Sequence, residues 1–343
     1  MLRNRFTATV DFFYEKRSDI LAIPYSVPLV LGMNNPQGTT RTDGQGLPPE
    51  NLGMVTNQGI DFELGFSDKK GPFSYFIRGN FTYARNVINK IDEEGKKYEW
   101  QKIQGKQIGQ HFGLTDIGLF SVNDFDQDAS GALRLEGGFP VLRKGLPVPS
   151  YGVVYPGDAK YKDLNGDGLI DSYDVGNIGH GSVPQFSYGI YVGGSYRNFD
   201  VSALVQGAGG GDIYLREDAL WEFFSLGKVM DHHLGRYNPD DPSSWDNATY
   251  PRLHPGENTN NHQKTTRWLF SRNYTRLKNV EIGYNFKKSL LSKVKLSNAR
   301  LFANGNNLLT FDHVMNWDPE SSSETGSGYP QLRTSNLGIN LTF

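Results

Sequence analysis

The sequence contains no cysteine among its 343 residues, which excludes disulfide bonds and thiolate metal sites. It has no apolar run close to the about 18 residues that indicate a transmembrane helix. Its net charge of −2, with 21% charged residues, gives no global field that would favour nucleic acid as a partner. The opening segment MLRNRFTATVDFFYEKR lacks the apolar core of a secretory signal peptide, so we expect none at this position.

Aromatic residues and glycine are abundant instead. Aromatics make up 13% of the chain, with 18 Tyr and 21 Phe, and there are 40 Gly. This mixture favours strands and turns over helices. The mean hydropathy of −0.52 is typical of a soluble protein. A transmembrane barrel has a similar average, because every second residue of its strands faces the lumen, so hydropathy does not decide the compartment.

Apolar and polar residues alternate along several segments, which is typical of strands with one apolar and one polar side. In GIDFELGFS, for example, Ile60, Phe62 and Leu64 alternate with Asp61 and Glu63. The pattern predicts about ten strands, at 4–17, 54–67, 72–88, 97–105, 112–121, 185–196, 199–208, 270–286, 298–310 and 334–343.

The connections between these predicted strands alternate between short and long. The short ones are at 68–71, 106–111, 197–198 and 287–297; the long ones are at about 18–53, 89–96, 122–184, 209–269 and 311–333. Outer-membrane barrels have this asymmetry, with short periplasmic turns and longer outer loops. A soluble β-sandwich is the alternative, but its strands are typically about 5–6 residues, whereas several predicted here exceed the about 9–11 that cross a bilayer. We therefore predict an all-β fold, an antiparallel up-and-down transmembrane β-barrel segment with long extracellular loops.

The last strand ends on an aromatic residue. Along SNLGINLTF one side carries apolar residues and the other carries Asn, Gly and Thr. A terminal strand of this kind resembles the signal by which the barrel-assembly machinery recognises outer-membrane proteins, and its apolar side would face the outer-membrane lipids. The candidate signal residues are Leu337, Ile339, Leu341 and Phe343. The alternative is an ordinary core strand.

One acidic loop matches a calcium-binding pattern. The stretch DLNGDGLIDSYD places oxygen-bearing residues at alternate positions and Gly168 at the sharp turn. The candidate Ca²⁺ ligands are Asp163, Asn165, Asp167, the Leu169 carbonyl, Asp171 and Asp174. Asp174 stands where a longer bidentate Glu is usual, so the expected affinity is weak. The alternative is a turn held by side-chain-to-backbone hydrogen bonds without metal.

Other clusters do not match a known type of site. His232, His233, His254 and His262 share one long connection, but their spacing fits no metal template, and we interpret them as solvated loop residues. GAGGGD follows a strand without opening a helix, which argues against a nucleotide site. No carboxylate pair stands out for glycoside hydrolysis. We therefore predict no enzymatic activity.

Several stretches together resemble the SusC/RagA-type TonB-dependent transporters of Bacteroidetes outer membranes. They are VTNQGIDFELGF, FSYFIRGNFTYARNVI, IGQHFGLTDIGLF, YPGDAKYKDLNGDGLID, IGHGSVPQFSYGIYVGGSYRNFDVSALVQGAGG, YTRLKNVEIGYNF and NARLFANGNNLLTF. The resemblance implies a barrel of which residues 1–343 are the C-terminal part, without the plug and the N-terminal strands. It also implies import of oligosaccharides or peptides, energy supplied through TonB by way of the plug, and a SusD-like lipoprotein partner.

Two interpretations remain open. The first is an importer segment in a Gram-negative, Bacteroidetes-like outer membrane, a fragment that does not transport by itself. The second is a secreted, calcium-stabilised carbohydrate-binding or scaffold module. Within LWEFFS, Trp221, Phe223 and Phe224 are equally consistent with a loop core, a lipoprotein contact or a substrate platform.

Overall fold

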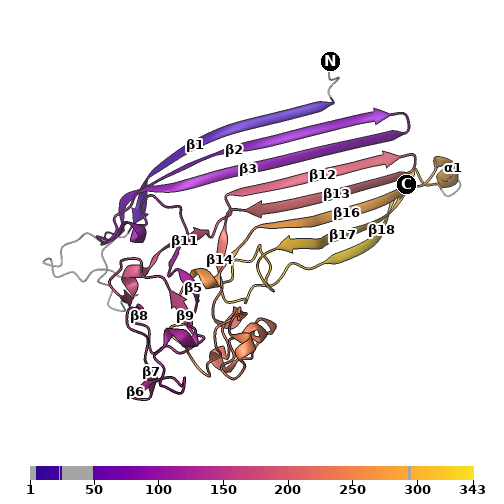
Figure 1. The fold of residues 1–343 in the computed structure, drawn as a ribbon. Helices are drawn as coiled ribbons and strands as arrows, with labels where there is room; N and C mark the ends of the chain where they lie inside the picture. Colours follow the sequence, from indigo (N-terminus) through magenta and orange to yellow (C-terminus); the bar gives the residue numbers. More distant parts are fainter. Residues whose placement is uncertain (1–4, 23, 25–48, 293–294) are drawn as a thin grey trace.

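Eight long strands form one antiparallel sheet in the computed structural model, which describes residues 5–22, 24, 49–292 and 295–343 (Figure 1). They are β1 (Phe6–Ala22), β2 (Glu50–Lys70), β3 (Phe73–Lys90), β12 (Phe186–Tyr196), β13 (Phe199–Gly209), β16 (Tyr274–Asn285), β17 (Asn298–Asp312) and β18 (Thr334–Thr342). Each pairs with the long strands next to it in the chain, so that β1 and β18, with one partner each, are the edges of the sheet in the described residues. The predicted up-and-down β-barrel topology is confirmed.

Two predicted strands do not belong to this sheet. Because β3 pairs directly with β12, with Tyr83 opposite Phe186, no strand lies between them. Segment 97–105 instead holds a 3₁₀ turn, and the indole of Trp100 donates to the Tyr173 carbonyl at 2.9 Å. Segment 112–121 breaks into two short strands that pair outside the sheet. The prediction of strands at 97–105 and 112–121 within the barrel wall was therefore wrong.

Connections of the two lengths still lie at opposite ends of the sheet. Residues 71–72, 197–198 and 286–297 make the short ones, the last with helix α1 (Lys288–Leu291). The long connections are 23–49, 91–185, 210–273 and 313–333. The predicted connections 89–96 and 122–184 therefore both belong to the single long connection 91–185. The two segments that leave the sheet are an even number of strands, so the direction of every later strand is unchanged. The long connections therefore still join strand ends at one end of the sheet.

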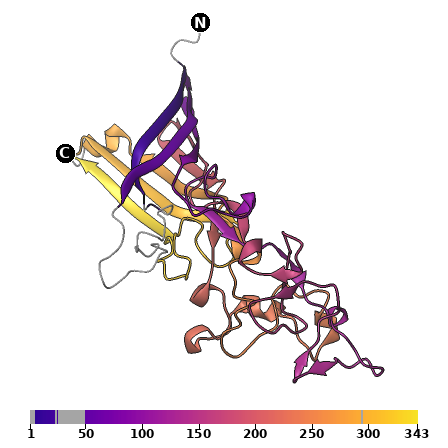
Figure 2. The ribbon, with the colours of Figure 1, turned by 90° about the vertical axis from the view of Figure 1, so that its left-hand side faces the viewer.

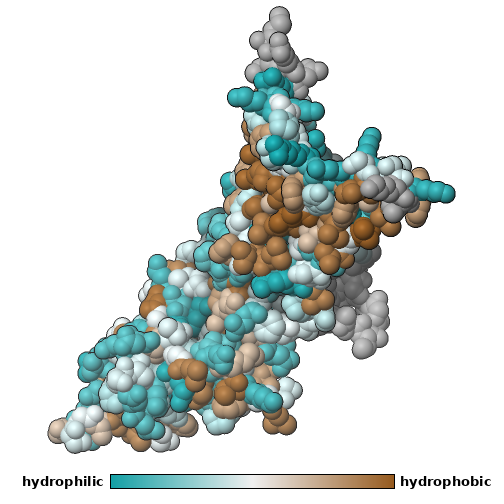
Figure 3. Space-filling view, turned by 90° about the vertical axis from the view of Figure 1, so that its right-hand side faces the viewer, coloured by the Kyte–Doolittle hydropathy of each residue, from teal (hydrophilic) through white to brown (hydrophobic). Residues whose placement is uncertain are grey.

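The sheet has one apolar and one polar face. Strand register places apolar side chains opposite one another in rows: one row runs Phe66, Ile77, Val192, Ala203 and Val280. None of these side chains is buried in a core; Ile77 is 47% exposed, and Val201, in another row of the same face, is 50% exposed. Figure 3 shows hydrophobic side chains gathered over the sheet, while the region beyond it is mostly hydrophilic.

The three described long connections, 91–185, 210–273 and 313–333, fold together beyond one end of the sheet (Figure 2), and we call them the loop body. A parallel bridge joins Leu114 to Thr265, and the Trp317 indole donates to the Ala219 carbonyl at 3.3 Å.

The loop body contains short strands and 3₁₀ turns. The short strands are β4 (Gln110–Gly113), β5 (Asp116–Leu119), β6 (Leu135–Glu136), β7 (Phe139–Pro140), β8 (Val148–Pro149), β9 (Ala159–Tyr161), β10 (Leu169–Ile170), β11 (Gly176–Gly181), β14 (Asp212–Tyr214) and β15 (Leu269–Ser271). Its 3₁₀ turns are η2 (Glu99–Gln101), η3 (Val122–Asp124), η4 (Ser172–Asp174), η5 (Glu217–Ala219), η6 (Phe224–Leu226), η7 (Asp231–Gly235), η8 (Pro242–Ser244) and η9 (Thr266–Trp268).

The hydrophobic core lies in the loop body rather than in the sheet. Its largest cluster includes Leu215, Leu220 and Trp268 from connection 210–273 and Val314 from connection 313–333. Among the described residues, no helix has the length and apolarity to span a membrane.

Candidate functional site

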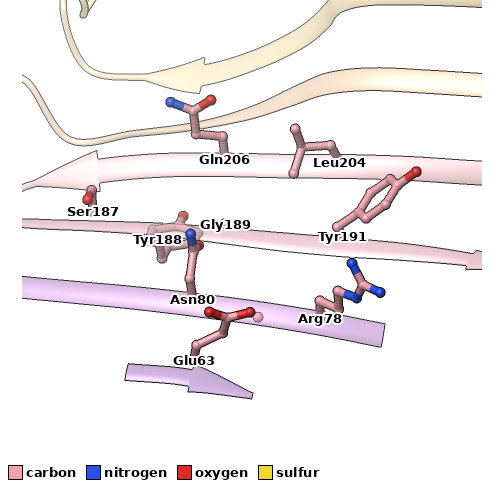
Figure 4. A pocket seen from close by; sticks show the side chains of 10 residues that line it. Glu63, Arg78, Asn80, Ser187, Tyr188, Gly189, Tyr191, Leu204 and Gln206 are labelled. Carbon is pink, nitrogen blue, oxygen red and sulfur yellow. The ribbon is translucent and has the colours of Figure 1, made fainter. Parts of the chain in front are cut away.

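The polar face of the sheet contains a hollow of about 380 Å³ near its centre. Four successive cross-strand partners cross it: Glu63 on β2, Asn80 on β3, Gly189 on β12 and Gln206 on β13. The next row along the strands brings Arg78, Tyr191 and Leu204 beside them. In Figure 4 Arg78 and Tyr191 lie at one end of the hollow, and Ser187 at the other.

The missing side chain at Gly189 opens this hollow. A Cβ built at Gly189 would lie 2.6 Å from Asn80 Oδ1. The strand spacing of about 4.8 Å puts the backbones of β3 and β13 about 10 Å apart, with Gly189 between them. The Asn80 amide therefore lies over Gly189, and Gln206 is the partner of Gly189 on the other neighbouring strand.

The charges in the hollow are unpaired. Neither Glu63 nor Arg78 makes an ion pair within the part of the chain that the structure describes. The Arg78 guanidinium lies 5.7 Å from the Phe76 ring centre, and that ring lies 4.9 Å from the Tyr191 ring. Farther along the same face, Arg300 pairs with Asp200 and, at 2.7 Å, with Glu281. The charges of Glu63 and Arg78 thus differ from that of Arg300, which is paired on the same face.

Connection 313–333 is fastened to the polar face at the loop-body end. Arg276 on β16 is 2% exposed and donates to both Asp318 oxygens, at 3.0 and 3.1 Å. The Tyr274 hydroxyl donates to Glu320 at 2.8 Å. Burial alone would raise the pKa of Asp318, but the Glu320 backbone N–H and the Arg276 guanidinium outweigh it and lower that pKa. The structure therefore fixes a long connection across the end of the polar face.

The structure places the six candidate calcium ligands in a tight turn. Asp163 accepts from the backbone N–H groups of Gly166 and Gly168, at 2.7 and 2.9 Å. Asp174 is fully buried, and its oxygens accept from the N–H groups of Leu164 and Asp171. Three other candidates also accept a backbone N–H group: the Asn165 side chain accepts from Asp167, that of Asp167 from Leu169, and that of Asp171 from Tyr173.

These bonds are of the side-chain-to-backbone kind expected for a hydrogen-bonded turn. In the described ranges, no three Asp, Glu or His side chains converge on one point that could hold a metal. Each Asp163 oxygen accepts one N–H and keeps a second lone pair, so the donor set remains compatible with a hard cation. The Ca²⁺ site stays a prediction.

The terminal strand lies where the alternation places it. Leu337, Ile339 and Leu341 on β18 stand opposite Ala303, Leu301 and Ala299 on the apolar face of β17. Leu337 is 78% and Phe343, just past the strand, 89% exposed. Their role as an assembly signal stays a prediction.

The interpretation of the histidines as solvated was wrong for two of them. His233 is 2% exposed, and its Nε2 lies 3.0 Å from the Leu220 carbonyl; burial lowers its pKa. His262 is 9% exposed and stacks on Trp221 at 4.4 Å. Trp221 packs against the largest core cluster, which favours the loop-core interpretation, whereas Phe223 is 38% exposed.

Sequence reasoning missed the hollow. It placed Glu63 on the polar side of its strand, but the two wrongly predicted strands separated β3 from β12 in the sequence order. A usable signal was present: Gly189 takes a polar-side position in QFSYGIYVGG, and glycine inside a strand marks a place where something approaches the backbone closely.

Comparisons with known proteins agree with the predicted family. TonB-dependent receptor P3 of Formosa agariphila is 25% identical over 366 aligned positions, which cover 99% of this chain and 32% of that protein. TonB-dependent receptor P26 of the same organism is 25% identical over 372 positions, covering 100% of this chain and 33% of the relative. No family model matches the chain. The chain thus spans about a third of the length of the curated relatives it matches.

Solved structures show the same fold. The RagAB peptide importer in its closed-closed state superposes with a TM-score of 0.67 at 19% identity, over 99% of this chain and 34% of that one. Its open-open state gives a TM-score of 0.68, also at 19% identity, over 99% and 33%. The resemblance to SusC/RagA-type TonB-dependent transporters is confirmed, and the fold is that of their barrel.

Proposed function

We propose that this chain forms part of the barrel wall of an outer-membrane importer of oligosaccharides or peptides. The observation that carries the proposal is the two-faced sheet, whose exposed apolar face suits lipid while the opposite face is polar. Homology to proteins named TonB-dependent receptors over the whole chain supports it. The loop body then lies on the extracellular side, and transport rather than catalysis is the activity.

The chain spans about a third of the length of its relatives, and the other parts of the importer lie outside it. We propose that residues 1–343 are the C-terminal barrel part, and that TonB acts through a plug outside this chain. A SusD-like lipoprotein covers the extracellular mouth, as the two-component name of the RagAB structures suggests. The barrel-assembly machinery inserts the protein by way of Leu337, Ile339, Leu341 and Phe343. This chain alone does not transport.

Fractionation tests the location. The chain, expressed with an export signal as part of the full-length importer in a Gram-negative host, is expected in the outer-membrane fraction and resistant to alkaline extraction. Recovery as a compact monomer without detergent would contradict the proposal and favour the secreted-module alternative.

The acidic loop is proposed separately as a weak extracellular Ca²⁺ site. The ligand pattern supports it, and sites of this kind bind with dissociation constants of about 10⁻⁴–10⁻³ M. Calorimetric titration is expected to show Ca²⁺ binding that Asp167→Asn weakens, while Asp128→Asn, in another exposed turn, changes nothing. No calcium heat, together with unchanged melting in chelator, would retire the metal and leave the hydrogen-bonded turn.

A further inference from the structure

We propose that His233, on turn η7, is an acid-released latch that closes residues 221–229 of the loop body. We call these residues the latched loop. The residues that form the latch all belong to connection 210–273, so parts of the importer outside this chain are not needed to form it. Only its extracellular setting rests on the import function proposed above. The latch makes this part of the loop body open in mild acid.

A single imidazole joins the two ends of the latched loop. At one end the backbone N–H of Met230 donates to His233 Nδ1 at 2.7 Å. At the other end His233 Nε2 lies 3.0 Å from the Leu220 carbonyl oxygen. Because Nδ1 accepts, the proton of the neutral ring is on Nε2, which donates to Leu220. The two bonds therefore require the neutral ring in one tautomer.

The latched loop has an unfavourable backbone conformation. Phe223, Ser225 and Leu226 have φ angles of 50°, 50° and 63°, in the left-handed region that residues with a side chain rarely adopt. Such conformations persist only where the surrounding contacts hold them. The three residues lie between Leu220 and Met230, which His233 holds together. Loss of either bond therefore allows the strained residues to relax.

Acid removes one of the two bonds. His233 is 2% exposed, and this burial lowers its pKa from the ordinary value of 6.5. Protonation places a hydrogen on Nδ1, so the acceptor for the Met230 N–H is lost and a charge is buried. The closed loop thus binds fewer protons than the open loop. Its stability is complete above pH 6.5 and decreases as the pH falls below that value.

The titratable neighbours of His233 do not take over this role. The His232 ring lies 4.1 Å away, and its charge lowers the pKa of His233 further. The Glu222 carboxylate has the opposite effect, but it already accepts from the Tyr250 hydroxyl at 2.6 Å and faces His262 at 3.5 Å. Burial would raise the pKa of Glu222, yet these two partners outweigh it and lower that pKa below 4.5. Glu222 therefore stays ionised at pH 5 and above.

Hydrogen exchange of the full-length importer in detergent tests the latch. Exchange is followed by mass spectrometry on peptides from 221–236 between pH 8 and pH 5, with correction for intrinsic rates. We expect constant protection at pH 7 and above, and acceleration of up to about tenfold per pH unit below 6.5. Peptides from β12 and β13 should show no such step. Constant protection of 221–236 from pH 8 to pH 5 would overturn the proposal.

His233→Gln separates the latch from an ordinary structural contact. The amide can still accept and donate, but it cannot be protonated in this range. We expect faster exchange in 221–236 at every pH and no acid step. His232→Gln is the matched control, because His232 Nε2 also lies 3.0 Å from the Leu220 carbonyl oxygen, whereas Met230 donates to His233.

The acid step should persist in His232→Gln. A step that remains in His233→Gln, or that disappears in His232→Gln, would assign the titration to another group and overturn the latch. Failure of the importer to reach the outer membrane would count against the import function instead, so the two failures are distinguishable.

Discussion

Glycine and aromatic residues occupy opposing positions on neighbouring strands of the sheet. Phe302 stands opposite Gly338, and its ring fills the space that a side chain at Gly338 would need, 2.5 Å from the built Cβ. Tyr188 covers Gly207 in the same way on the other face. The ring shields a backbone that glycine leaves bare, a device that also pins strand register. Gly189 is covered by the Asn80 amide instead of a ring, which distinguishes the hollow at the level of single residues.

Asp318 gives a pH prediction at this scale. Its folded pKa lies below the ordinary value of 3.8, so the stability it contributes is present above pH 3.8 and is lost as pH falls through the folded pKa. The backbone N–H groups of Glu320 and Gln331 both donate to Asp318. Hydrogen exchange of these two amides is therefore expected to be constant from pH 7 to 4, after correction for intrinsic rates, and to accelerate below.

Asp318→Asn is the control for that measurement. The amide keeps an acceptor but loses the charge that faces Arg276. In this variant we expect the Glu320 and Gln331 amides to be less protected from exchange at neutral pH. We also expect no further acceleration of their exchange below pH 4. An acid step that persists in the variant would assign it to another group.

At the scale of the element, alternation decides what each strand tolerates. Val201 on β13 is 50% exposed on the apolar face, opposite Gly194 and Ile282. Its neighbour Ser202 points to the polar face, opposite Gly193 and Glu281. A one-residue step therefore moves a side chain from the lipid side to the wet side.

Val201→Arg is expected to reduce assembly into the outer membrane, whereas Ser202→Arg should be tolerated. An arginine on the lipid face costs about 2–4 kcal/mol at mid-membrane and less toward the interfaces, and Val201 lies near the short-turn end of β13; on the lumen face the cost is smaller. The measurement is the heat-modifiable folded band on a gel of the outer-membrane fraction. Equal effects of the two substitutions would contradict the assignment of the faces.

On the scale of the whole molecule, the sheet and the loop body are stabilised differently. In the described residues β1 and β18 are the two edges of the sheet order, and edges of this kind pair with further strands. The loop body has a core of its own. Fully buried Asp158 joins two connections there: it accepts from Asn261 at 2.9 Å and from Arg252 at 3.2 Å.

Asp158→Ala should therefore loosen the loop body and leave the sheet intact. Removing one partner of a buried ion pair costs about 3–5 kcal/mol, because the other charge stays buried. Limited proteolysis is expected to cut within 91–185 and 210–273 while the strands stay protected. Asp126→Ala, whose partner Arg134 is 56% exposed, is the control and should change little. Protection equal to wild type in Asp158→Ala would show that the core alone holds the loop body.

The amino-acid order alone determined the two-faced strands, the end at which the long connections lie, and the apolar side of the last strand. These follow from a period of two and from connection length, which are local properties. Only the tertiary structure decided that 97–105 and 112–121 leave the sheet, because their partners, such as Tyr173 and β9, lie far away in the chain. The hollow also depends on the tertiary structure, because strand pairing places Asn80 and Gln206 beside Gly189. These contacts are non-local, so the spacing of residues within one segment does not encode them.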